Sequence, residues 1–126
     1  MESQPVRYAV VGVRSDREFW AEAGAAARRI DAGGGYQGEH FTFETPAQLF
    51  AVYTQNRWAL IEKLQEIGPS SLRNLARALG RDVKRVHEDV AVLLGEGIVE
   101  RTADRKLSVP FETISIEAKL RASKAA

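Results

Sequence analysis

The chain of 126 residues contains no cysteine and no apolar run long enough to cross a membrane. Without cysteine, disulfide frameworks, cysteine-ligated zinc fingers and thiol catalysis are all excluded. The apolar run near the amino terminus has about six residues flanked by Arg7, so it is too short for a membrane span and lacks the layout of a signal peptide. We therefore expect a cytoplasmic protein without membrane contact.

Residues that commonly hold metals or phosphates are also scarce. Only two histidines occur, His40 and His87, which gives little support for a metal site. The triplet Gly33–Gly35 lacks the following Lys and Ser or Thr of a phosphate-binding loop, and Gly12 alone does not form a dinucleotide-binding fingerprint. The sequence therefore predicts no enzyme, no cofactor and no metal centre.

What the chain does have is the composition of one soluble domain, with 44% apolar and 28% charged residues. Its net charge of +1 conceals an uneven distribution, because residues 1–55 carry −2 and residues 56–126 carry +3. Between residues 70 and 87, five Arg and Lys residues accompany a single acid, Asp82. Such a cluster either covers a solvated helix face or binds an anionic partner.

The first 45 residues are predicted to form a strand-helix-strand extension. Val6–Val13 favours a strand, a capping box at Ser15–Glu18 begins a helix of about four turns, and Gly33–Gly35 ends that helix. His40–Glu44 alternates aromatic and polar residues, which indicates a second short strand. We interpret residues 1–45 as a candidate dimer or partner interface.

The next stretch is divided into four helices by capping residues, namely Thr45, Thr54, Ser71 and Asp82. The helix after Ser71 has apolar residues at helical spacing and ends at Gly80. Only Arg81 then separates it from the cap of the last helix. The predicted order is therefore a helix, a tight turn and a helix.

The helix after Asp82 is amphipathic. Five apolar residues share the side that we expect to be buried, namely Val83, Val86, Val90, Leu93 and Leu94. His87 lies at the margin of that side, where we expect it to pack or to form a hydrogen bond. Arg85 and Asp89 have the i,i+4 spacing of an ion pair.

The opposite side of this helix has the chemistry of a DNA-recognition helix. The first two turns of such a helix enter the major groove, where base edges present acceptors for Arg and Lys. We predict three base-reading side chains, Arg81, Lys84 and Arg85. Glu88 lies beside them and either accepts a hydrogen bond from a cytosine amino group or limits nonspecific phosphate binding.

Phosphate contacts are predicted from the preceding helix and from a hairpin. Ser71, Arg73 and Arg77 belong to the helix that crosses the DNA backbone in this motif. Residues 98–102 and 106–109 are predicted to be two strands joined by a tip without the glycine typical of tight turns. This hairpin, or wing, offers three further cations to a phosphate or a minor groove, namely Arg101, Arg105 and Lys106.

Two segments, RWALIEKLQEIGPSSLRNLARALGRDVKRVHEDV and IVERTADRKLSVP, resemble a prokaryotic winged helix-turn-helix family of transcriptional regulators that is MarR-like in form. The leader from Tyr8 to Phe43 is also similar. The resemblance implies an α+β fold, with a winged helix-turn-helix at residues 46–110 that binds DNA. It also implies that such a regulator can be the antitoxin of a toxin-antitoxin pair.

Residues 111–126 are predicted to form a further strand, with alternating Ile114, Ile116 and polar residues, followed by a frayed tail. Together with the leader strands, this strand could form a small sheet or lend an edge to a second copy or to a partner protein. Our first hypothesis is a homodimeric, sequence-specific repressor of double-stranded DNA, because two half-sites multiply affinity. The alternative is an antitoxin that neutralises a cognate toxin protein and represses its own operon.

Overall fold

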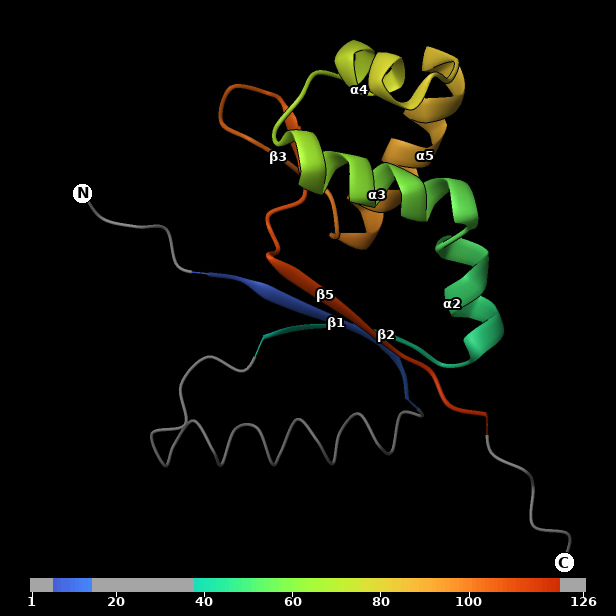
Figure 1. Cartoon of the computed structure of the whole chain (residues 1–126). Coiled ribbons are helices and arrows are strands. Elements are labelled where there is room, and N and C mark those ends of the chain that lie inside the picture. The colour runs from blue at the N-terminus through green and yellow to red at the C-terminus, as the bar shows by residue number, and fades with distance from the viewer. Residues whose placement is uncertain (1–5, 15–37, 121–126) are drawn as a thin grey trace, which may run out of the picture. The chain divides into compact units, whose positions relative to one another are not determined.

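The computed structural model describes residues 6–14 and 38–120, which contain four helices and five strands (Figure 1). In chain order they are β1 (Tyr8–Val13), β2 (Glu39–Phe43), α2 (Pro46–Val52), α3 (Gln55–Ile67), α4 (Leu72–Leu79), α5 (Val83–Glu96), β3 (Glu100–Arg101), β4 (Leu107–Ser108) and β5 (Thr113–Glu117). This mixture of helices and small sheets agrees with the predicted α+β class. The helix expected after Ser15 lies outside the described residues.

The described residues divide into two compact units. The first unit contains Ala51–Glu112, and the second combines Arg7–Phe50 with the segment from Thr113 onward. The first unit is therefore inserted in the chain between β2 and β5. It contains α3, α4, α5 and the hairpin of β3 and β4, whereas the second contains the three strands β1, β2 and β5.

The helices α3, α4 and α5 begin at the capping residues that the sequence predicts. Each cap accepts a hydrogen bond from the backbone amide three residues on, at 3.3, 3.1 and 3.3 Å for Thr54, Ser71 and Asp82. Gly80 and Gly97 follow α4 and α5 with φ of 65° and 87°, a left-handed conformation that glycine adopts without a Cβ clash. No helix in the described ranges is both long and apolar enough to span a bilayer.

The three helices of the first unit turn apolar side chains toward a common core. The buried residues of these helices are Leu60, Ile61, Leu64, Leu75, Ala76, Val86, Val90 and Leu93. Tyr53 packs edge-on against Trp58, with 6.0 Å between the ring centroids. Burial, with a smaller contribution from Glu96, raises the pKa of Tyr53 to about 12, so its phenol is neutral at physiological pH.

The predicted hairpin is present, although its strands are shorter than expected. β3 and β4 have two residues each and pair antiparallel, with Glu100 opposite Ser108 and Arg101 opposite Leu107. Leu107 also exchanges two backbone hydrogen bonds, of 2.9 and 2.8 Å, with Ser70 in the connection between α3 and α4. This link, which no local sequence pattern indicates, attaches the hairpin to the residues just before α4.

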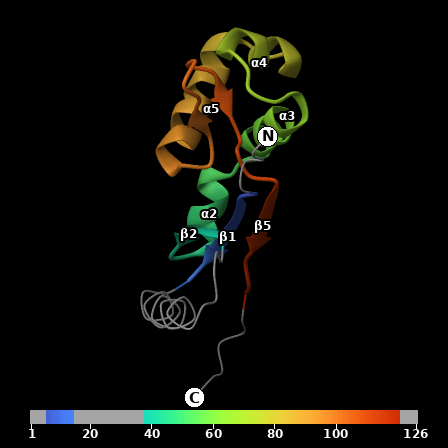
Figure 2. The same cartoon turned by 90° about the vertical axis from the view of Figure 1, so that its left-hand side faces the viewer.

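The second unit contains a parallel sheet in the order β2-β1-β5 (Figure 2). In the central strand, Ala9 and Val11 are 1% and 0% exposed. The strand expected over residues 111–120 is β5, and Ile114 and Ile116 lie in register with Ala9 and Val11. The carboxy-terminal strand thus joins the leader strands in a small sheet, as the sequence predicts.

Candidate nucleic-acid interface

The helix α4 presents two cations on its exposed side. Arg73 and Arg77 are exposed, while Leu75 and Ala76 face the core. Ser71 is exposed as well, but its hydroxyl already accepts the amide hydrogen of Asn74 as the helix cap. The hydroxyl hydrogen of Ser71 can still be donated to a ligand, and both arginines have guanidinium groups available to an anion.

The amino-terminal half of α5 has one exposed side. Lys84, Arg85 and Glu88 are exposed, as the helical projection predicts. Two other predictions were wrong: Val83 is 40% exposed instead of buried, and His87 is exposed instead of packed. The buried residues of α5 are Val86, Val90 and Leu93, so the buried stripe starts at Val86 and not at Val83. The exposed side of α5 therefore also includes Val83 and His87.

The predicted outward position of Arg81 was also wrong. Its Nη2 atom lies 2.7 Å from Oδ2 of Asp89, and the side chains of the two residues are only 23% and 14% exposed. Arg81 precedes the cap of α5, so helical periodicity does not determine where its side chain points. The expected pair of Arg85 and Asp89 is replaced by this contact, because Arg81 approaches Asp89 across the turn from α4.

A second arginine contacts the same carboxylate. Nε of Arg57 lies 3.1 Å from Oδ1 of Asp89, and its Nη1 donates to the carbonyls of Ala51 and Val52 at 3.3 and 3.0 Å. We call Arg57, Arg81 and Asp89 the Asp89 cluster. Two charge-assisted contacts to one carboxylate join the start of α3, the turn after α4 and the middle of α5. No sequence signal indicated the contact with Arg57, which lies 32 residues from Asp89.

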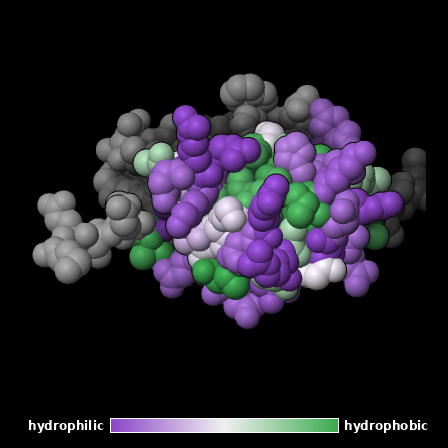
Figure 3. All heavy atoms as spheres, turned by 90° about the horizontal axis from the view of Figure 1, so that it is seen from above, coloured by the Kyte–Doolittle hydropathy of each residue, from purple (hydrophilic) through white to green (hydrophobic). Residues whose placement is uncertain are grey.

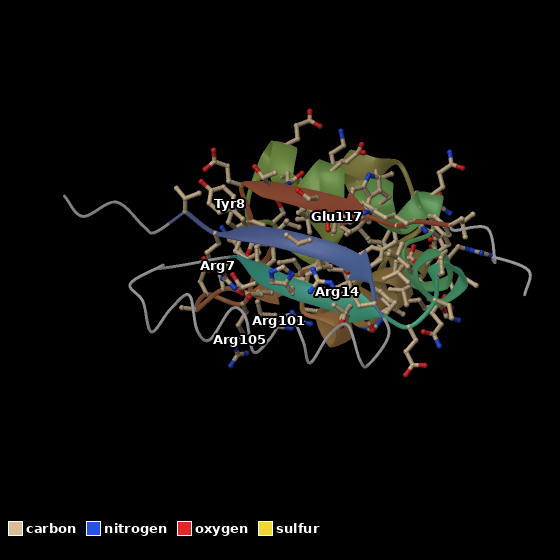
Figure 4. All side chains as sticks on the ribbon, turned by 90° about the horizontal axis from the view of Figure 1, so that it is seen from below. Arg7, Tyr8, Arg14, Arg101, Arg105 and Glu117 are labelled. Carbon is tan, nitrogen blue, oxygen red and sulfur yellow. The ribbon has the colours of Figure 1, made fainter. Side chains whose placement is uncertain are left out.

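The hairpin carries the remaining predicted cations. Arg101, Arg105 and Lys106 are exposed, and Arg105 extends away from the hairpin in Figure 4. Lys106 is partly neutralised, since its Nζ lies 3.8 Å from Oδ2 of Asp104. Nine of the ten predicted site residues are thus exposed, and Arg81 is the exception.

The tip of the hairpin closes without glycine. The amide of Arg105 donates to the carbonyl of Thr102 at 2.9 Å, and Arg105 adopts the left-handed φ of 65° that glycine normally supplies in such a turn. The hydroxyl of Thr102 donates to Asp104 and accepts the amide hydrogen of Lys106 at 3.0 Å. The hydrogen bond from Thr102, with smaller contributions from the backbone amide of Asp104 and from Lys106, holds the pKa of Asp104 below its usual value, so this carboxylate stays ionised.

The resulting surface exposes cations on α4, α5 and the hairpin, and these suit an anionic ligand. Figure 3 looks onto the end of the molecule where α4 lies and shows mainly hydrophilic side chains around a smaller number of apolar ones. The described residues contain no group of three His, Cys, Asp or Glu side chains that could hold a metal. The cations exposed on α4, α5 and the hairpin all belong to the first unit.

The chain was compared with known protein families, curated proteins and solved structures. The model of the family HVO_A0114 matches residues 52–116. This range begins at the last residue of α2 and includes α3, α4, α5, the hairpin and most of β5. No curated protein and no solved structure matches the chain.

Proposed function

The chain belongs to the HVO_A0114 family, and we propose that it is a transcriptional regulator that binds double-stranded DNA in a sequence-specific manner. The proposed DNA-binding element is a winged helix-turn-helix made of α3, α4, α5 and the hairpin of β3 and β4. One observation carries the proposal: directly after a tight turn from α4, the start of α5 exposes Lys84 and Arg85 while Val86 packs into the core.

The backbone arrangement supports this proposal. Gly80 and Asp82 end α4 and begin α5 with a single residue between them, which is the short connection that a helix-turn-helix needs. The hairpin is held to the start of α4 by the paired backbone of Ser70 and Leu107. This backbone bridge supports the proposal that the hairpin contacts DNA at the same time as α5.

The side chains of α5 support reading of the major groove. Lys84 and Arg85 can donate to the acceptors of guanine, and the exposed methyl groups of Val83 can contact the methyl group of thymine. His87 adds a donor or acceptor on the next turn. For Glu88, acceptance from a cytosine amino group and restriction of nonspecific binding both stay open.

The proposed roles of the cations differ from those inferred from the sequence at one position. Arg73 and Arg77 on α4 and Arg105 on the hairpin are assigned to phosphates, where charge adds affinity without sequence readout. Arg81 is assigned to holding α5 in place through Asp89, because its guanidinium already has that partner.

The test is selection of preferred duplexes from a randomised library, followed by titration of the selected and a scrambled duplex with three variants. Arg85→Ala is expected to weaken binding of the selected duplex about 10- to 100-fold and to change the selected sequence. Arg73→Ala is expected to weaken both duplexes similarly and to lower the salt dependence by about one phosphate contact. Lys63→Ala is the charge-matched control on α3, beside Glu66, and should leave both affinities unchanged. If the library yields no preferred sequence, the proposed function is wrong.

A further inference from the structure

The strand β5 forms one edge of the parallel sheet. β1 occupies the inner side of β5, and no described strand pairs with the outer side. Figure 4 shows β5, with Glu117, along the border of the sheet and β1 between β5 and β2. Thr113, Ser115, Ile116 and Glu117 are exposed, with Ile116 at 41%. The backbone groups on this side are therefore free to pair with another strand.

This edge has few of the features with which proteins usually prevent pairing, and Glu117 is its one charged residue. Between Thr113 and Glu117 there is no proline, no lysine and no glycine, and the register with β1 runs without a bulge. Three of the five residues are β-branched, which favours an extended strand. An edge of this composition is suited to binding a further strand.

The sequence of β5 is complementary to itself in one antiparallel register. If Ser115 lies opposite Ser115 of a second copy, each Ile114 lies opposite an Ile116 and each Thr113 opposite a Glu117. The isoleucines form apolar pairs that cover the exposed Ile116, and the threonine hydroxyl can donate to the carboxylate.

Other self-pairings are less favourable. A parallel arrangement in register would place the two Glu117 carboxylates beside each other, and like charges in adjacent strands repel. An antiparallel shift by two residues would leave one isoleucine of each strand opposite a residue other than isoleucine. A shift by one residue would place isoleucines opposite polar residues.

We propose that β5 pairs antiparallel with β5 of a second copy about a twofold axis at Ser115, so that the two sheets join into one of six strands. The role of this dimer rests on the proposed function, because a twofold dimer would present two copies of α5 to the two halves of a palindromic DNA site. The contact itself does not require DNA.

The chain offers a clean test because it contains no cysteine. Residues directly opposite in an antiparallel pair have Cα atoms about 4.5 to 5.5 Å apart, which a disulfide can bridge. Ser115→Cys is therefore expected to form a covalent dimer on mild oxidation without DNA. The control is Thr113→Cys, whose two copies would lie four residues apart along the strands, or roughly 13 Å, and should not cross-link.

A second variant tests the apolar pairs. Ile116→Lys places a charge opposite Ile114 and is expected to yield a folded monomer in sedimentation at micromolar concentration, whereas Ile116→Val stays a dimer. Cross-linking of Thr113→Cys but not of Ser115→Cys, or a dimer that survives Ile116→Lys, would overturn the proposal. A monomeric native chain, or one whose β5 pairs only with a different protein such as a toxin, would overturn it equally.

The two proposals fail separately. If Ser115→Cys cross-links and no duplex is selected, the interface stands while the DNA-binding proposal is wrong. If the native chain selects a duplex and sediments as a monomer, DNA binding stands and the β5 interface is wrong.

Discussion

At the scale of single residues, Arg105 has an unfavourable backbone conformation and a side-chain charge that suits its proposed role. Its φ of 65° is a left-handed conformation in which a side chain with a Cβ is strained by about 1 kcal/mol. The same residue places an exposed guanidinium at the tip of the hairpin, where we propose a phosphate contact. Glycine would suit the turn better, so the arginine costs stability at a position where its charge is useful.

Arg105→Gly is therefore expected to raise the free energy of unfolding by about 1 kcal/mol and to weaken DNA binding. Urea unfolding and duplex titration measure the two effects on one preparation. Arg105→Asn is the control, because asparagine tolerates the left-handed region and removes only the charge. A glycine variant that is less stable than the native chain, or one that keeps full affinity, would contradict this assignment.

At the scale of elements, the direction of α5 depends on the Asp89 cluster. Asp89 lies in the middle of α5, while Arg57 and Arg81 belong to the start of α3 and to the turn before α5. The side chains of all three residues are less than a quarter exposed, at 21%, 23% and 14% for Arg57, Arg81 and Asp89. Water therefore screens these contacts less than it would on the open surface. We therefore expect the cluster to hold α5 in place against the start of α3 and the turn before α5.

Asp89→Asn is expected to destabilise the protein by about 2 kcal/mol, because two partly buried guanidinium groups lose their anion. The variant should lose affinity for the selected duplex more than for the scrambled one, since correct placement of α5 matters only for base contacts. The measurements are urea unfolding and titration of both duplexes.

Glu66→Gln is the matched control for this prediction. It breaks the pair of Lys63 and Glu66 at 3.1 Å on α3, where Glu66 is 68% exposed, and should cost less than about 0.5 kcal/mol. Equal losses of stability in the two variants would show that the cluster does not position α5. The same conclusion would follow if Asp89→Asn lost equal affinity for the selected and the scrambled duplex.

At the scale of the whole molecule, the buried apolar side chains are distributed unevenly between the two units. Of the apolar side chains buried in the described residues, all but Ala9, Val11 and Leu49 belong to the first unit. That unit also contains the cations assigned to DNA, whereas the edge strand β5 belongs to the second. Recognition and assembly are therefore proposed for different units.

A fragment of residues 45–112 is expected to fold on its own, because it retains the helix caps, the Asp89 cluster and the paired Ser70 and Leu107. It should sediment as a monomer and bind a half-site duplex with the same preference as the whole chain. Circular dichroism, sedimentation and titration test the three statements. An unfolded fragment, or a fragment that remains dimeric, would contradict the division of roles.

The sequence by itself determined the helices and most of their bounds. Thr54, Ser71 and Asp82 cap their helices where predicted, and Gly80 ends α4, because these effects act between residues a few positions apart. Apolar spacing likewise identified Val86, Val90 and Leu93 as the buried side of α5. The exposed position of Lys84 and Arg85 follows from the same periodicity.

Only the tertiary structure decided how distant segments meet. The contact of Asp89 with Arg57, the pairing of Ser70 with Leu107 and the parallel register of β5 with β1 join residues that no local pattern relates. Arg81 was misplaced for a related reason, since it lies in the turn, where helical periodicity does not apply and a carboxylate eight residues on sets its direction. Short-range propensities thus define the elements, while packing and paired charges decide which surfaces remain exposed to a partner.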